Sequence, residues 1–465
     1  MVIGDDLTRD DLVRLVYELH DRVVSLEGEN AELQEQLREL LKSQGPRSGG
    51  GKREAPPWVK ANRPAPADDA GPKERKKRAE NHGRKLEAAT EEVIHAVEVC
   101  PDCGRRLSGG WEHHRRQVID IPAPSYIVWD HIYLRRYCGV CRKDHLPRPD
   151  LTSEVTGKHR VSNRIMALVT YLRIGSRMPL ESIQENLRVQ YGLSLSNGEL
   201  TRILQTVSEL CRDQYEALLE EVRSSPVVHA DETGWRENGV NGYLWAFLTE
   251  TVRWFTRKQS RGSVVPLTVL GRNGSRIVVS DFYTGYSPLM CKKQRCWVHF
   301  LRDLKKLDED NPEDRGVKAF RAKIHKLYEK AVAYRTMQLT LKGPVPIRIL
   351  SRRVELREKF EEALMRLAQP HLGKSKDPCR KLAERIKKYL YEFFVFVEHP
   401  QAPPENNLAE RALRPTVVAR KISGGTRSAR GSEAMAILRS LFATWACRGL
   451  APYDACLALL ASPHH

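Results

Sequence analysis

Four short apolar segments between residues 226 and 281 constrain the fold of this chain more than any other feature. They read PVVHAD, GYLWAFLTE, VRWFTRK and RIVVSD. Segments of this length that are rich in β-branched and aromatic residues are typical of strands. Residues 262–271, which have helical character, separate the third segment from the fourth. The sequence therefore predicts a core that contains both a sheet and helices.

Three acidic residues lie at informative places in this pattern. Asp231 ends the first apolar segment, Asp281 ends the fourth, and Glu410 lies in PENNLAERALRP, which is typical of the first turns of a helix. Hard divalent cations prefer oxygen ligands, and two such ions about 3.5–4 Å apart can hold a phosphodiester during in-line displacement. The pattern favours a site for two divalent metal ions, although most Asp and Glu side chains simply lie on a protein surface.

Two other acidic residues compete for this site. Glu232 follows Asp231 directly, but neighbouring side chains of an extended strand point to opposite faces of the sheet. Glu433 lies at the start of a predicted helix near 433–448. We therefore expect the first three acids to form the site, with Glu433 as the alternative to Glu410.

Two CxxC pairs, separated by 34 residues, predict a zinc ribbon over residues 91–150. The pairs consist of Cys100, Cys103, Cys138 and Cys141. Four thiolates complete the tetrahedral site of a structural zinc ion. The sequence between the pairs has the character of a β-hairpin or two strands. A redox role for the pairs is the alternative, and His145 could replace one thiolate.

The charge of the chain indicates a polyanionic partner. The 465 residues carry a net charge of +18, whereas residues 1–40 contain 11 acidic and 4 basic residues. The rest of the chain therefore carries a net charge of +25. Such an excess favours nucleic acid as the partner, and a generally basic soluble protein is the alternative.

The composition also bears on the location of the protein and the number of its domains. No apolar segment approaches the roughly 18 residues of a membrane span, and the acidic N-terminal segment is unlike a signal peptide. The cysteines outside the CxxC pairs are scattered, which argues against a disulfide framework. We expect a cytoplasmic, nucleoid-associated protein with more than one domain.

A heptad pattern in residues 1–42 predicts a coiled coil that makes a homodimer or a higher oligomer. Leucine recurs every seven residues, at Leu12, Leu19, Leu26, Leu33 and Leu40. Val16 and Val23 occupy companion positions, which favours two parallel strands, and Asn30 at such a position would select register and dimeric state. A single amphipathic helix packed on its own domain is the alternative.

Two further segments connect this helix and the ribbon to the predicted core. Residues 43–90 are rich in Pro, Gly, Ser and charge, which is typical of a basic flexible linker. Residues 155–224 have helical character. Within them, one helix is expected to end at Gly192 and the next to begin at Ser196, where Glu199 completes a capping box. A DNA-binding helix-turn-helix and an ordinary helical hairpin both remain compatible with this spacing.

Four motifs, taken in this order, resemble the IS66 family of bacterial insertion-sequence transposases, which are members of the DDE group. They are HADETGW at 229–235, VVSDFYTGY at 278–286, QRCWVHFLRDL at 294–304 and NNLAERALRP at 406–415. The N-terminal leucine-rich helix, the CxxC pairs and the helical segment also fit the family, so the resemblance spans most of the chain.

The resemblance implies a multidomain α+β protein with an RNase H-like α/β core. Residues 225–304 and 401–465 would form this catalytic domain, and residues 305–400 would form a helical insertion. The order of three strands, a helix and a fourth strand agrees with such a core.

The resemblance also implies a reaction. Asp231, Asp281 and Glu410 would bind two Mg²⁺ (or Mn²⁺) ions. The protein would bind double-stranded DNA at the terminal inverted repeats of its element, cleave there, and transfer the 3′-hydroxyl ends to target DNA. Related elements often encode accessory proteins.

Several other residues are predicted to contact DNA. Arg411 and Arg414 follow Glu410, where they could steady the carboxylate, contact phosphate, or form a surface salt bridge. Arg427 and Arg430 belong to KISGGTRSARGSE (421–433), which could bind phosphates or be a mobile loop. Trp235 could line the DNA cleft or pack in the core. His299, in a CxxH motif with Cys296, could orient a phosphate or belong to a buried structural pair.

Two other functions remain compatible with the sequence. One is a transposase-derived DNA-binding protein that lacks cleavage activity. The other is a metal-dependent nuclease that hydrolyses DNA without strand transfer.

Overall fold

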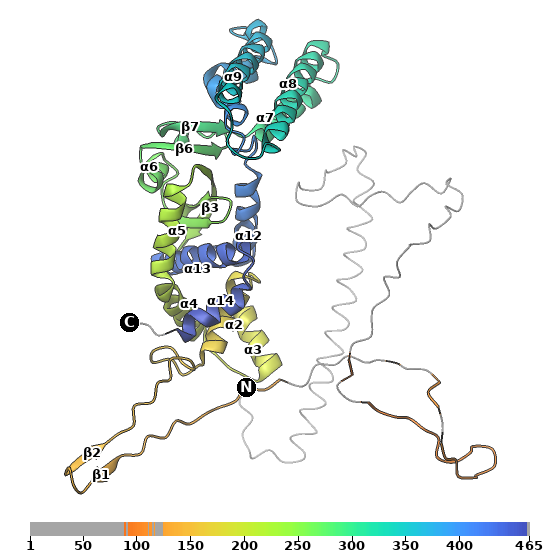
Figure 1. The fold of residues 1–465 in the computed structure, drawn as a ribbon, viewed down its shortest axis with the longest axis vertical. Helices are drawn as coiled ribbons and strands as arrows, with labels where there is room; N and C mark the ends of the chain where they lie inside the picture. Colours follow the sequence, from red (N-terminus) through yellow and green to blue (C-terminus); the bar gives the residue numbers. More distant parts are fainter. Residues whose placement is uncertain (1–87, 90–91, 110, 114–115, 117–123, 463–465) are drawn as a thin grey trace, which may run out of the picture. The chain divides into compact units, whose positions relative to one another are not determined.

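The computed structural model describes residues 88–89, 92–109, 111–113, 116 and 124–462 (Figure 1). The chain divides into two units, Met1–Val118 and Ile119–His465, and each is considered by itself. The predicted coiled coil at 1–42 and nearly all of the predicted linker at 43–90 lie outside the described residues.

A five-stranded mixed sheet forms the centre of the second unit. Its strands are β3 (Val227–Glu237), β4 (Val240–Leu248), β5 (Arg253–Lys258), β6 (Asn273–Ser280) and β7 (Met290–Arg295). The order is β5-β4-β3-β6-β7, with β4 antiparallel to both of its neighbours and with β3, β6 and β7 parallel. The four predicted strands are confirmed, and so is the helix between the third and fourth, α6 (Val264–Leu270). The fifth strand, β7, was not predicted.

In the part of the chain that the structure describes, four helices precede the sheet. They are α2 (Asn163–Ile174), α3 (Leu180–Tyr191), α4 (Asn197–Leu210) and α5 (Arg212–Ser224). As predicted, α3 ends at Gly192, which takes the left-handed conformation with φ 70°. Ser196 and Glu199 form the predicted capping box at the start of α4. Both boundaries follow from local chemistry that the sequence carries by itself.

One hydrophobic core joins these helices to the sheet. Ile203 on α4 and Leu219 on α5 are buried in the same cluster as Trp245 on β4. The last two helices, α13 (Ala429–Cys447) and α14 (Pro452–Ala461), add residues to that cluster, and α13 packs on β5 and α4. The helices before the sheet and those at the end of the chain therefore build one body with it.

The segment after β7 is helical, as the sequence predicted for residues 305–400. It contains α7 (Trp297–Asp310), α8 (Arg315–Leu339), α9 (Ile347–Ala368), α10 (Arg380–Tyr389) and the short α11 (Val395–Glu398). A second core, which includes Trp297 and Phe300 of α7 with Phe393 and Phe394, holds these helices together. The chain then returns to the sheet and forms α12 (Asn407–Ser423).

The long helix α12 covers the sheet face opposite the first core. Ala409 and Leu413 of this helix are buried with Trp235 of β3 and Leu244 of β4. The sheet is therefore covered on both faces, which is the layered arrangement of α/β proteins.

Among the residues that the structure describes, no helix is both long enough and apolar enough to cross a lipid bilayer.

Candidate active site

The pairing of β3 with β6 brings Asp231 and Asp281 to the same region of the sheet. Val227 pairs with Ile277 and His229 with Val279 in parallel register. Asp231 lies two residues beyond this pairing on β3, and Asp281 lies two residues beyond it on the other chain segment. Because the two strands are parallel, both acidic residues lie just beyond the same end of their hydrogen-bonded pairing.

The prediction that Asp231 ends a strand is wrong. Strand β3 continues to Glu237, and its antiparallel ladder with β4 includes a pair between Asp231 and Ala246. The extension arises because a two-residue turn at Asn238 and Gly239, both with positive φ, closes a hairpin between β3 and β4. Asp231 thus lies within β3, just beyond the point where the parallel pairing of β3 with β6 ends.

Asn406 places the start of α12 against the strand that carries Asp231. Its side-chain nitrogen donates to the carbonyl of Ala230 at 2.9 Å, and its side-chain oxygen lies 2.9 Å from Nδ1 of His229. Its backbone N–H donates to Sγ of Cys296 at 3.2 Å. Asn406 has no exposed surface. Since Glu410 follows one helical turn later, these contacts fix the helix that brings the third acid to the site.

The three acids influence one another electrostatically. The pKa of Asp231 is raised to about 8, first by burial and then by the negative charges of Glu232, Asp281 and Glu410. Oε1 of Glu410 is buried and has no hydrogen-bond partner. A group of partly buried carboxylates that repel one another is suited to a divalent cation, because the cation would remove the repulsion and supply the missing partner.

The two competing acids have other partners. Glu232 forms an ion pair with Arg261 at 2.8 Å and accepts a hydrogen bond from Tyr286 at 2.7 Å. Glu433, at the start of α13, pairs with Arg212 at 2.9 Å. Basic or hydroxyl groups lie within hydrogen-bond distance of both carboxylates, whereas Oε1 of Glu410 has no hydrogen-bond partner among the described residues and lies 3.6 Å from Nε2 of His299. The geometry therefore favours Glu410 over Glu433 as the third member of the cluster.

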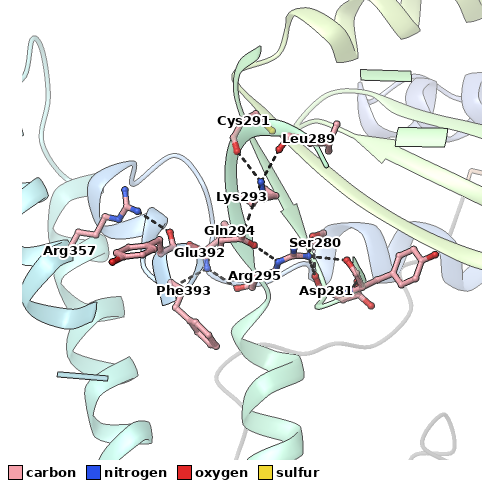
Figure 2. Close-up of polar contacts among 12 residues, drawn as sticks. Ser280, Asp281, Leu289, Cys291, Lys293, Gln294, Arg295, Arg357, Glu392 and Phe393 are labelled. Carbon is pink, nitrogen blue, oxygen red and sulfur yellow. Dashed lines mark hydrogen bonds and ion pairs between the residues drawn. The ribbon is translucent and has the colours of Figure 1, made fainter. Parts of the chain in front are cut away.

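The backbone around Asp281 is held by a buried arginine (Figure 2). Nη1 of Arg295 donates to the carbonyl of Asp281 at 2.7 Å and to the carbonyl of Tyr283 at 3.2 Å. Oδ1 of Asp281 accepts from the backbone N–H of Tyr283 at 2.9 Å. Sequence reasoning missed both Arg295 and the strand β7 that carries it. The only signal was the position of this residue directly before Cys296 in the QRCWVHFLRDL motif.

The CxxH motif lies beside Glu410. Nε2 of His299 is 3.6 Å from Oε1 of Glu410, and potential ligand atoms of Cys296, His299 and Glu410 all lie within 4.8 Å of one another. Burial raises the pKa of the Cys296 thiol, which favours the neutral form that accepts a hydrogen bond from Asn406. His299 thus occupies the position beside the carboxylate that the sequence had suggested for Arg414.

The four arginines that the sequence predicted to contact DNA lie at the surface. Arg411, Arg414, Arg427 and Arg430 are all exposed, and they make no hydrogen bond or ion pair within the described parts of the chain. Arg411 and Arg414 therefore do not steady Glu410 in this structure. Like Arg427 and Arg430, they are open to a partner outside the chain.

Trp235 is not open to such a partner. Only 2% of its surface is exposed, it packs under α12, and its ring nitrogen donates to Oγ1 of Thr426 at 3.1 Å. The expectation that Trp235 contacts DNA is therefore replaced by a packing role. The burial depends on a helix some 170 residues later, which the local sequence does not reveal.

The loop between α12 and α13 is joined to the end of β3. The N–H of Thr426 donates to the carbonyl of Arg236 at 3.0 Å, and the N–H of Asn238 donates to the carbonyl of Thr426 at 2.8 Å. Gly425 has φ 125°, a conformation that favours glycine. These contacts argue against a freely mobile loop and hold the backbone next to Arg427 in place. Arg430 lies in the first turn of α13.

Each CxxC pair forms a tight turn. Gly104, directly after the first pair, has φ 70°, and Arg142, directly after the second, has φ 50°. Backbone N–H groups within each pair lower the pKa of the Cys100 and Cys138 thiols. Such donors favour the thiolate form that binds metal.

The second pair belongs to a short hairpin of β1 (Arg136–Cys138) and β2 (Lys143–His145). Potential ligand atoms of Cys138, Cys141 and His145 lie within 4.8 Å of one another. The β-hairpin or two strands predicted between the pairs are not found in residues 124–135, which have no regular secondary structure. The first pair belongs to the other unit of the chain, so the four-cysteine site stays a prediction.

Comparison with known proteins identifies the chain as a member of a transposase family. A protein-family model, described as the transposase IS66 family, matches residues 158–434, which are more than half of the chain. The chain therefore belongs to the IS66 family of transposases. All four motifs that carry the resemblance lie inside the matched residues, together with Asp231, Asp281 and Glu410.

A curated relative matches a smaller part. The uncharacterized protein y4jO of Sinorhizobium fredii is 29% identical over 185 residues, which are 39% of this chain and 51% of the relative. The chain thus spans about half the length of the curated relative that it matches.

Proposed function

We propose that this chain is a DDE transposase, which binds the ends of an insertion sequence, cleaves the DNA there, and joins the 3′-hydroxyl ends to target DNA. The observation that carries the proposal is the meeting of three acids from three separate elements. Asp231 comes from β3, Asp281 follows β6, and Glu410 comes from α12. The charges of Asp281 and Glu410 both raise the pKa of Asp231.

The sheet supports an RNase H-like reading of the core. Three consecutive antiparallel strands lead through α6 to β6, which lies parallel to the first strand of the set. In such a core, acids from the first and fourth strands are neighbours. Asp231 and Asp281 have this relationship.

The residues present fit two divalent cations. The donor set consists of carboxylate oxygens, which Mg²⁺ and Mn²⁺ prefer. One of these oxygens, Oε1 of Glu410, is buried and has no hydrogen-bond partner among the described residues. When bound, the two ions would activate the attacking oxygen and stabilise the leaving oxygen. The acids would hold them, and His299 would orient Glu410.

The remaining parts of the chain are proposed to serve DNA binding and assembly. Arg411, Arg414, Arg427 and Arg430 present exposed positive charge on α12 and beside it, where it can bind phosphates. A zinc ion held by the four cysteines would fold the ribbon. The N-terminal heptads would join two protomers, because both ends of an element must be held together. Accessory proteins could join this complex on nucleoid DNA in the cytoplasm.

A strand-transfer assay tests the proposal. Purified protein is incubated with Mg²⁺ or Mn²⁺, target DNA, and duplexes that contain the inverted repeats flanking its gene. Covalently joined products are expected from the wild type and from Glu433→Ala, the matched acid outside the cluster. No products are expected from Asp231→Ala, Asp281→Ala or Glu410→Ala.

The products separate the alternatives. Hydrolysed ends without joined products would identify a nuclease. Binding without cleavage, with the wild type and Asp231→Ala alike, would identify a DNA-binding protein that descends from a transposase.

A further inference from the structure

Arg295 is a buried cation at the boundary between the sheet and the helical insertion. It is the last residue of β7 and has no exposed surface. On the sheet side, Nη1 donates to the carbonyls of Asp281 and Tyr283 and to Oγ of Ser280, the last at 3.2 Å. One guanidinium nitrogen therefore holds the turn in which Asp281 lies.

The insertion supplies the counter-charge for this guanidinium. Nε of Arg295 donates to Oε2 of Glu392 at 2.6 Å, and the ring of Tyr389 lies 4.7 Å from the guanidinium carbon. Figure 2 shows Arg295 between Glu392 on one side and Ser280 with Asp281 on the other. Glu392 belongs to the segment that returns from the insertion, so the pair joins two parts of the chain almost 100 residues apart.

The returning segment is attached to β7 by further buried hydrogen bonds. The side chain of Gln294 donates to the carbonyl of Phe393 at 3.0 Å and accepts from the N–H of Phe396 at 3.0 Å. The ring nitrogen of Trp297 donates to the same carbonyl of Phe393 at 2.6 Å. The insertion is therefore docked on the strand next to β6, immediately beside the turn that contains Asp281.

We infer that Arg295 is a positioning residue, which couples docking of the helical insertion to the placement of Asp281. A buried cation requires a partner because the desolvation penalty is large. Glu392 provides that partner only while the insertion is docked. The guanidinium then fixes the backbone carbonyls on both sides of residue 282, and this directs the Asp281 carboxylate. The role of Asp281 in catalysis rests on the proposed function. The effect of Arg295 on the conformation of the Asp281 turn does not.

Hydrogen exchange of the full-length chain tests whether Arg295 and Glu392 hold the turn that contains Asp281. Arg295→Lys keeps the charge but loses the forked donor, and Glu392→Gln keeps the size of the side chain but loses the counter-charge. Both are expected to increase exchange of the amides of residues 281–286. Arg357→Gln is the matched control. Arg357 pairs with Glu361 and Glu398 and donates to the carbonyl of Tyr391 in the same docked region, but it does not reach the Asp281 turn.

Binding of Mn²⁺, followed by electron paramagnetic resonance, tests the consequence for the site. Loss of residues that support metal ligands typically weakens metal binding by about 10- to 100-fold. We expect a shift of that size for Arg295→Lys, a smaller one for Glu392→Gln, and wild-type binding for Arg357→Gln. Asp281→Ala gives the reference for a lost ligand.

The outcomes separate this inference from the proposed function. If the two variants exchange like the wild type at residues 281–286, or if Arg357→Gln loosens that turn equally, the positioning role is wrong. If exchange changes as expected but the wild type neither binds Mn²⁺ nor joins DNA, the coupling stands and the proposed transposase activity fails.

Discussion

The side-chain amide of Asn406 donates a hydrogen bond to the carbonyl of Ala230, 2.9 Å away, and this contact joins α12 to β3 one residue before Asp231. The same side chain faces Nδ1 of His229 at 2.9 Å. Burial lowers the pKa of His229 to about 4, so this ring is neutral at physiological pH and donates its Nδ1 proton to the amide oxygen. Two of the three acids thus owe their relative position to one amide group.

Asn406→Ala should destabilise the fold and the site together. The substitution leaves the His229 ring nitrogen and the Ala230 carbonyl without partners, at about 1–3 kcal/mol for each buried group, so we expect a loss of about 2–6 kcal/mol in the free energy of unfolding. Urea unfolding measures the loss. Asn407→Ala, at the next and only partly buried position, is the control and should change stability by less than about 1 kcal/mol. Equal losses in the two variants would contradict the role of Asn406.

Asp231 should make the metal-free protein less stable as the pH rises. Burial, with the charges of Glu232 and Asp281, raises its pKa from 3.8 to about 8. Between these values the folded state keeps a proton that the unfolded state has lost, so this group's contribution to stability falls as the pH increases from about 4 to about 8. Asp231→Asn removes this dependence. The variant should unfold at the same temperature as the wild type near pH 4, and at a higher temperature at pH 8.

Thermal unfolding in the presence of a chelator checks this prediction. The difference in melting temperature between Asp231→Asn and the wild type should increase steadily with pH, although the variant is expected to be inactive. Asp213→Asn, at an exposed position on α5, should show no such trend. A constant difference across the pH range would show that Asp231 is ionised in the folded protein throughout.

The elements that the sequence predicted well are those with local signals. The strands β3 to β6 carry apolar and β-branched residues, and the boundary between α3 and α4 is set by a left-handed glycine and a capping box. Strand β7 has no such signal, because its buried residues are Gln294 and Arg295. Their partners are Phe393, Phe396 and Glu392, which come from the far end of the insertion.

The candidate site likewise contains residues that local sequence patterns predict and residues whose environment depends on distant segments. Asp231, Asp281 and Glu410 could be selected from their places in apolar and helical patterns together with a family resemblance. The burial of Trp235 and the contact of His299 with Glu410 depend on α12, which lies more than 100 residues away along the chain. Local periodicity says nothing about such contacts, since they arise only when the two segments pack.

Gly425→Ala should loosen the loop that presents Arg427. Gly425 has φ 125°, and a Cβ atom there would collide with the carbonyl oxygen of Arg236. Strain of this kind costs about 1–3 kcal/mol. Gly424→Ala is the matched control. Its φ of 72° is also unfavourable for alanine, but the space around it is open, so we expect a smaller loss. Equal melting temperatures for the two variants would contradict the close contact between the loop and β3.

Removal of zinc ligands should unfold the β1–β2 hairpin without affecting the sheet. The hairpin contains three residue pairs and has no apolar core of its own, so a bound ion is expected to supply much of its stability. Cys138→Ser and Cys141→Ser should each lose the metal, measured as zinc per chain, and should increase hydrogen exchange at residues 136–145. Cys447→Ser, at an exposed free cysteine, should keep the wild-type zinc content. Purified wild-type protein without zinc would contradict the ribbon.

The combined substitution of Arg427 and Arg430 by Ala should weaken DNA binding without a loss of stability. Both side chains are exposed and make no hydrogen bond or ion pair with the described part of the chain, so their removal breaks no internal contact. Each phosphate contact contributes about 0.9 to the slope of log affinity against log salt concentration, so the slope should fall by about 2. Arg188→Ala is the control, because Arg188 on α3 is also exposed but pairs with Glu185 at 2.8 Å. Fluorescence anisotropy with a labelled duplex at several salt concentrations measures the slopes. An unchanged slope in the double variant would place the DNA on another surface.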